Sequence, residues 1–219
     1  TFYPMVEMSR ILGEDVIRGL ISMNQNSLYE EYIFSGMTGL KGYADIDDYI
    51  EELFDKKLIS DKKSFKELIE KGIEAAEQVV ELEAQNISRY SPKVVAASSL
   101  FAQQNGTLAI LKRVKELLPD VKTIVGGPNC DGQAGKVLLK RFSQVDAVFF
   151  GEGDEVFAET IRALIDGGSL PYGVMRKADI IPDGVNLPEI PYRITRNLDS
   201  CPIPDFDDFY PYISRIPKE

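Results

Sequence analysis

The chain has 219 residues, of which 44% are hydrophobic and 27% charged, and this composition is typical of a folded globular protein. The formal charge of −10 disfavours nucleic acid and anionic membranes as partners, and no run of about 18 apolar residues predicts a membrane span. The chain has no histidine, which excludes imidazole catalysis and histidine metal ligands, and its two cysteines lack the spacing of a cluster motif. We expect a cytoplasmic protein with no metal site of its own.

The first 90 residues have the apolar periodicity of helices. Three helices are predicted there, over residues 9–22, 45–54 and 64–87. Asp45 is the predicted N-cap of the second helix and Ser64 that of the third. Three aromatic residues between the first two helices are expected to pack in the core, with a binding surface as the alternative: Tyr29, Tyr32 and Phe34.

From residue 91, short apolar segments alternate with helical patterns, which is typical of a parallel sheet with crossover helices. Strands are predicted at residues 94–98, 123–125, 147–150 and, more weakly, 173–175. Helices are predicted at residues 106–118, 134–142 and 155–165. Because the strands are almost wholly apolar, helices should cover both faces of the sheet. We therefore expect a Rossmann-like or flavodoxin-like α/β domain over residues 91–177, after a helical segment at 1–90.

Residues 178–219 are rich in proline and aspartate, which predicts an irregular linker. Three carboxylates in this segment are interpreted as a solvated stretch and not as a metal site: Asp205, Asp207 and Asp208. Cys201 lies beside prolines in the same segment and is given no role.

Three successive strands end in distinctive loops. The candidate binding residues are Ser98, Ser99, Leu100 and Phe101 in the first loop, Gly126, Gly127, Pro128 and Asn129 in the second, and Gly151, Glu152 and Gly153 in the third. The carboxyl ends of parallel strands share one edge, where such folds bind ligands, and glycine lets the backbone approach a ligand closely. Each loop alone is explained by turn chemistry, so the prediction of one composite site depends on the three together.

Two common nucleotide motifs are absent. Gly151 and Gly153 begin a G-x-G pattern, but Val156 stands where the third glycine of a dinucleotide site belongs. No GxxxxGK[ST] sequence is present either. Cys130, which follows the second loop, could approach a ligand, although a buried packing role is favoured.

With these loops, residues 98–157 resemble the cobalamin-binding domain of cobalamin-dependent radical SAM enzymes, and most closely the group that matures ribosomally made peptides. That family has a Ser-x-Leu-like loop, a Gly-Gly loop and a GEG[DE] loop around the cofactor. The matching positions here are Ser98 and Leu100, Gly126 and Gly127, and Gly151, Glu152 and Gly153. Residues 198–209 are similar to the linker that leads into the radical SAM barrel.

The resemblance implies that this chain binds cobalamin and is part of a methyltransferase that acts on a peptide. It places the 4Fe–4S cluster and S-adenosylmethionine in a radical SAM domain of the same parent protein, outside this chain. The CxxxCxxC motif of that cluster does not occur in the 219 residues, so we expect no complete active site and predict no catalytic residue. The first residue is a threonine, as expected of a fragment.

Two departures from cobalamin domains stand out. The DxHxxG motif cannot occur without histidine, so cobalamin would bind without an imidazole from the protein on cobalt. This arrangement favours homolytic methyl transfer, while the protein supplies burial, orientation and electrostatics. The domain usually opens with a strand, but residues 1–20 have helical periodicity, and we recognise no such strand.

Two other functions are compatible with the sequence. The same edge could bind a flavin or a nucleotide in a flavodoxin-like module without chemistry of its own. Alternatively, the helical segment could be an interaction domain fused to an inert α/β scaffold.

Overall fold

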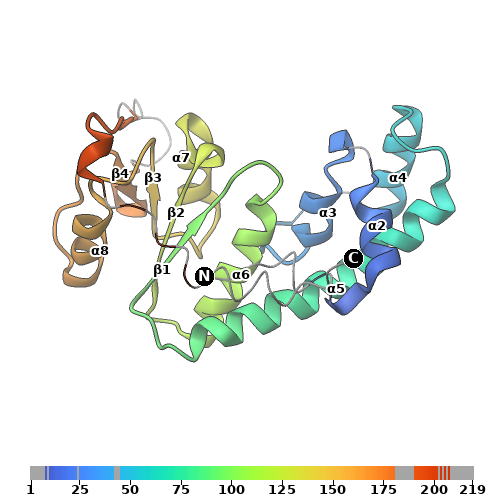
Figure 1. Ribbon diagram of the computed structural model, residues 1–219, viewed down its shortest axis with the longest axis horizontal. Coiled ribbons are helices and arrows are strands. Elements are labelled where there is room, and N and C mark those ends of the chain that lie inside the picture. The colour runs from blue at the N-terminus through green and yellow to red at the C-terminus, as the bar shows by residue number, and fades with distance from the viewer. Residues whose placement is uncertain are drawn as a thin grey trace.

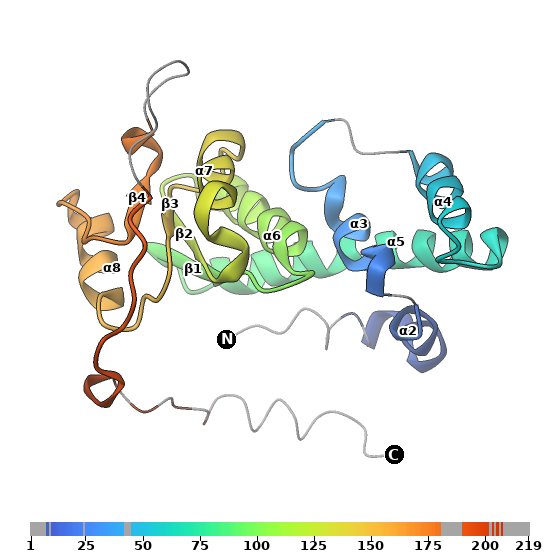
Figure 2. The same ribbon diagram turned by 90° about the horizontal axis from the view of Figure 1, so that it is seen from above.

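The computed structural model describes residues 8, 10–23, 25–41, 45–180, 190–201, 203, 205 and 207. A helical region lies at one end of an elongated molecule and an α/β region at the other, and the long helix α5 runs along both (Figure 1, Figure 2). The α-helices and strands are α2 (Glu14–Ile21), α3 (Tyr29–Ser35), α4 (Ile46–Asp55), α5 (Lys62–Ser88), β1 (Val94–Ser98), α6 (Gln104–Leu117), β2 (Lys122–Gly126), α7 (Gly132–Arg141), β3 (Ala147–Phe149), α8 (Phe157–Asp166) and β4 (Val174–Arg176). Short 3-10 turns are η1 (Gln25–Ser27), η2 (Pro128–Cys130), η3 (Lys177–Asp179) and η4 (Leu198–Ser200).

The N-caps of two helices test the sequence predictions. Asp45 caps α4 by accepting a hydrogen bond from the amide of Asp47 at 2.9 Å, which confirms that prediction. The prediction of Ser64 as the cap of α5 is wrong. Asp61 caps this helix, accepting from the amides of Lys63 at 3.0 Å and Ser64 at 3.1 Å. The apolar stripe that guided the prediction begins one turn after the helix itself, because the first turn is polar.

The helix predicted over residues 9–22 is interrupted. Residues 10–12 are helical, but Gly13 has a φ of +74° and α2 begins only at Glu14. Glycine adopts this φ without the steric cost that a Cβ would add. The periodicity of the apolar residues continues across the break and therefore does not reveal it. Ser9 lies outside the described residues.

The aromatic residues of α3 pack inside the helical region, as predicted. Tyr29 and Phe34 are buried, and the ring of Tyr32 stacks on that of Tyr49 with centroids 3.8 Å apart. These side chains join residues of α2, α4 and α5 in one apolar core, to which Ala109 of α6 also belongs. The helical region thus packs directly on a helix of the α/β region.

The sheet has the order β1-β2-β3-β4, with β1, β2 and β3 parallel. The expected fourth strand forms, but it runs antiparallel, with Val174 opposite Phe149. The direction differs from a βα repeat because the residues after α8 return the chain to the carboxyl end of β3, where the amide of Phe150 donates to the carbonyl of Gly173 at 2.7 Å. Within the described residues, β1 pairs only with β2.

Helices cover both faces of the sheet, which is a mixed α/β fold of the Rossmann-like type. Val125 and Val148 pack with residues of α6 and α7 on one face. Ile124 and Phe149 pack with residues of α8 on the other face. The second half of α5 packs against the outer side of α6. No helix in the part of the chain that the structure describes is long and apolar enough to cross a membrane.

Candidate functional site

The three predicted loops meet at the carboxyl edge of β1, β2 and β3 (Figure 1). We call residues 98–103 loop 1, residues 126–131 loop 2 and residues 151–155 loop 3. Ser98 lies opposite Gly126 in the β1–β2 ladder, so loops 1 and 2 leave the sheet side by side. Parallel strands place successive loops on one edge, and the structure shows this juxtaposition.

Loops 1 and 2 are tied together by Ser99 and Asn129. The backbone amide of Ser99 donates to the carbonyl of Gly126 at 2.8 Å. The side-chain amide of Asn129 donates to the Ser99 hydroxyl at 3.0 Å and to the carbonyl of Phe101 at 2.6 Å. Ser99 is fully buried. The polar groups of Ser99 and Asn129 therefore serve the contact between the loops.

Close packing requires glycine at position 127 of loop 2 and favours it at position 126. Gly127 has φ +103° and ψ 172°, a conformation that is essentially restricted to glycine. A Cβ there would lie 2.6 Å from the carbonyl oxygen of Ser99. A Cβ at Gly126 would lie 3.2 Å from the Cβ of Phe149. The backbone of loop 2 thus lies against loop 1 and strand β3.

Loop 1 presents apolar side chains to solvent. Phe101 is 83% exposed and Leu100 is 39% exposed, and Ser98 is also exposed. Phe101 has a φ of +46°, which is unusual for an aromatic residue and marks local strain. The hydrogen bond from Asn129 holds this strained conformation. An ordered, strained and exposed aromatic residue at a strand-end loop is the kind of feature that ligand sites contain.

Loop 3 contacts residues 193–195, which belong to the segment expected to be a linker. Residue Arg193 forms a parallel bridge with Gly151, and a Cβ at Gly151 would lie 2.1 Å from the Arg193 carbonyl oxygen. The carboxylate of Glu152 accepts a hydrogen bond from the amide of Thr195. Arg193 also pairs with Glu155, with an N–O distance of 2.8 Å. The hydrogen bond from Arg193 holds the pKa of Glu155 below its usual range. Gly151 therefore allows Arg193 to approach loop 3 closely, and the carboxylate of Glu152 binds the amide of Thr195.

Sequence reasoning missed several residues that shape this edge. Asp131 accepts a hydrogen bond from the amide of Gly151 at 2.9 Å and so joins loop 2 to loop 3. Its position just before α7 is typical of an N-cap, and this local signal could have drawn attention to it. Arg193 and Thr195 come from a segment with no such signal. Gly153, which is one of the predicted residues, lies close to strand β3. A Cβ added there would be 3.3 Å from the ring of Phe149.

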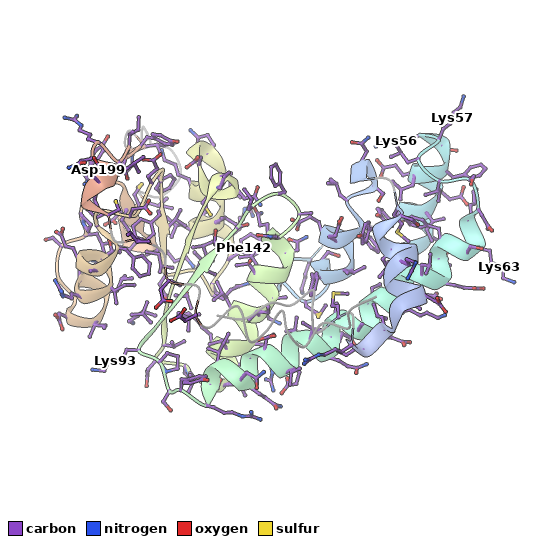
Figure 3. All side chains as sticks on the ribbon, viewed as in Figure 1. Lys56, Lys57, Lys63, Lys93, Phe142 and Asp199 are labelled. Carbon is purple, nitrogen blue, oxygen red and sulfur yellow. The ribbon has the colours of Figure 1, made fainter. Side chains whose placement is uncertain are left out.

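The three loops themselves have no basic side chain, and Arg193, which lies beside loop 3, is paired with Glu155. Loops 1, 2 and 3 contain no lysine or arginine, while Asp131, Glu152, Asp154 and Glu155 lie in loops 2 and 3. Figure 3 shows Lys93 at the amino end of β1, and three other labelled lysines at the far end of the helical region: Lys56, Lys57 and Lys63. An anionic ligand would therefore find little electrostatic attraction here.

The site has no evident metal ligands. Among the residues that the structure describes, no group of three or more histidine, cysteine, aspartate or glutamate side chains is placed to hold a metal ion. Asp208 of the carboxylate run lies outside those residues. Cys130 is fully buried, as favoured from the sequence, and burial raises the pKa of its thiol to about 12. A thiol with this pKa stays protonated at neutral pH and is a poor ligand or nucleophile.

Comparison with known proteins agrees with this geometry. Residues 69–161 match the family model of the B12 binding domain, a range that starts within α5 and ends in α8. The chain is also similar to an uncharacterized methyltransferase of Pyrococcus horikoshii, at 26% identity over 126 residues. That match covers 57% of this chain and 26% of the relative. No solved structure shows significant similarity. Together, the α/β fold and the family match support a B12-binding, that is cobalamin-binding, domain in this chain.

Proposed function

We propose that loops 1, 2 and 3 hold cobalamin at the carboxyl edge of the sheet, in a domain spanning residues 91–177. The observation that carries the proposal is the chemistry of this edge. The three loops lack lysine and arginine, and loop 1 exposes the side chains of Ser98, Leu100 and Phe101. Flavin and dinucleotide sites bind phosphate through helix N-termini and basic side chains. Cobalamin has one phosphodiester in its nucleotide tail, but most of its surface is a corrin ring with uncharged amide side chains, which fits an apolar, non-basic rim better.

The exposed residues of loops 1 and 2 would make the contacts. Leu100 and Phe101 would cover apolar surface of the corrin, and the hydroxyl of Ser98 would bond an amide side chain. Pro128 adds an exposed apolar residue on loop 2. When bound, cobalamin would supply the chemistry of methyl transfer, while these residues orient it and exclude water. These 219 residues contain no histidine, so this chain offers no imidazole to cobalt.

We assign a supporting role to the site residues whose side chains already form hydrogen bonds within the chain. Ser99 and Asn129 fix loop 1 against loop 2, and Glu152 fixes the linker against loop 3. A ligand at this edge would meet a surface shaped by these contacts without bonding their polar atoms.

The test is retention of the cofactor by the purified chain. After incubation with hydroxocobalamin and desalting, we expect corrin absorbance at one equivalent per chain, and no retention of flavin mononucleotide in a parallel sample. The variant Ser98→Leu, with a bulky side chain on the carboxyl edge, should lose retention. Ser143→Leu is the matched control, because Ser143 is also exposed but precedes β3 at the opposite edge. A folded chain that retains no corrin would overturn the proposal, and retained flavin would favour the flavodoxin-like alternative.

We further propose that the parent protein is a cobalamin-dependent radical SAM methyltransferase acting on a ribosomally made peptide, with residues 178–219 as the linker. The resemblance of the three loops to that family supports this, and so does the relative that bears the name methyltransferase. The 4Fe–4S cluster and S-adenosylmethionine would act in the domain beyond the linker. Parent protein with a reconstituted cluster should transfer the labelled methyl group of S-adenosylmethionine to a peptide. The absence of a cluster-binding motif from the parent sequence would refute this proposal.

A further inference from the structure

The start of α6 is capped by a residue from the helical region. The carboxylate of Glu31, on α3, accepts hydrogen bonds from the amide of Gln104 at 2.9 Å and from the amide of Asn105 at 2.7 Å. The side-chain amide of Asn105 donates to the carbonyl of Glu31 at 3.0 Å. These contacts cross more than 70 positions of the sequence.

The cap is needed because α6 has none of its own. The first amides of a helix have no partner within the helix. Gln103, at the N-cap position, makes no capping hydrogen bond with its side chain. The side chain of Gln103 instead accepts a hydrogen bond from the amide of Leu100 at 3.2 Å, within loop 1. Glu31 supplies both acceptors and a negative charge that the helix dipole favours.

The position of Glu31 is itself fixed by packing. Gly106 of α6 lies against the ring of Phe34, which a Cβ would approach to 3.5 Å. The side-chain amide of Gln144 donates to the carbonyl of Thr38 at 2.8 Å and to that of Leu108 at 3.1 Å, which joins the end of α3 to α6. The carboxylate is therefore held in place by the packing of α3 on α6 and is not a mobile surface group.

We infer that Glu31 is a positioning residue for loop 1, and that the helical region contributes to ligand binding through it. Loop 1 is held at one end by β1 and at the other by the start of α6. Asn129 fixes its middle. Without Glu31, the end of the loop would lose its anchor, and the exposed side chains of Leu100 and Phe101 would lose their defined positions. The carboxylate also occupies the two amides that would otherwise attract a ligand phosphate. The part of this inference that concerns cobalamin rests on the proposed function.

The experiment compares Glu31→Gln and Glu31→Ala with the wild-type chain. The matched control is Glu77→Gln, because Glu77 is an exposed glutamate on α5. Hydrogen–deuterium exchange of the cobalamin-free chain reports on the amides of residues 99–105. Loss of two hydrogen bonds to a charged group should speed their exchange about ten- to hundredfold in Glu31→Ala. Glu31→Gln, which keeps one acceptor, should show a smaller change.

Binding of hydroxocobalamin gives the second measurement. We expect its Kd to rise at least about tenfold in Glu31→Ala, less in Glu31→Gln and not in Glu77→Gln. Faster exchange throughout α5 as well as loop 1 would indicate general destabilisation and would refute a positioning role. Unchanged exchange and affinity in Glu31→Gln would refute it even if Glu31→Ala does not fold. If the wild-type chain binds no cobalamin, the proposed function fails, whereas the exchange measurement still decides whether Glu31 orders loop 1.

Discussion

Replacement of Gly127 by alanine tests whether loop 2 needs glycine because loop 1 lies against it. The backbone at Gly127, with φ +103° and ψ 172°, would cost about 1–3 kcal/mol for alanine. The added Cβ would also lie 2.6 Å from the carbonyl oxygen of Ser99, an overlap that costs about 1–3 kcal/mol to relieve. We therefore expect Gly127→Ala to lower the free energy of unfolding by about 2–6 kcal/mol.

Gly132→Ala provides the control that separates the two causes. Gly132 also has a positive φ, of +59°, but a Cβ there would meet no atom within 4 Å. Its replacement should cost only the conformational term, about 1–2 kcal/mol. Urea unfolding followed by circular dichroism gives both free energies by linear extrapolation. Equal losses in the two variants would refute the argument that contact with Ser99 selects glycine at position 127.

Three further outcomes follow from named contacts. Arg193→Ala should raise the lowered pKa of Glu155 toward that of an unpaired carboxyl group, as measured by NMR titration, and an unchanged pKa would contradict the ion pair. Because the folded-state pKa is lowered, this pair stabilises the fold above the ordinary carboxyl pKa, and its contribution is lost as the pH falls through the lowered value. Cys201, which is half-buried, should react with a thiol reagent at pH 8 before Cys130 does, and rapid reaction of both thiols in the folded chain would contradict the burial of Cys130. Asp61→Ala should lower the thermal unfolding midpoint, since two amides of the first turn of α5 lose their acceptor, and an unchanged midpoint would show that the cap is not needed.

The elements of the α/β region could be predicted closely from sequence because their signals are local. The strand at residues 94–98 was predicted with the bounds of β1, since a short apolar run between polar segments defines it. The antiparallel direction of β4 could not be predicted. Strand direction depends on the path of the preceding loop, and the three residues of β4 contain no sequence pattern that distinguishes a parallel from an antiparallel strand. The break at Gly13 in the helix predicted over residues 9–22 could not be predicted. The chain changes direction only locally at this glycine, and the apolar periodicity continues on both sides of it.

The candidate site could also be predicted only in part from the sequence. Glycines and serines after successive strands indicated the three loops, and the topology then brought them together. The partners of those loops could not be found in this way. Glu31 and Arg193 act across 73 and 38 positions, and such pairings are fixed by the packing of whole elements and not by neighbouring residues. Glu152 illustrates the consequence: its place in loop 3 predicts a cofactor contact, but the sequence does not indicate that its carboxylate accepts a hydrogen bond from the amide of Thr195.

The linker on loop 3 has a thermodynamic consequence. Arg193 and Thr195 bond the same loop that a ligand at the carboxyl edge would meet, so docking of the linker and binding of the ligand share one structural element. Binding free energies that are coupled through a shared element are reciprocal. If a docked linker strengthens ligand binding by some factor, the bound ligand must strengthen docking of the linker by the same factor. The ligand would then also control how firmly residues 193–195 are held against loop 3.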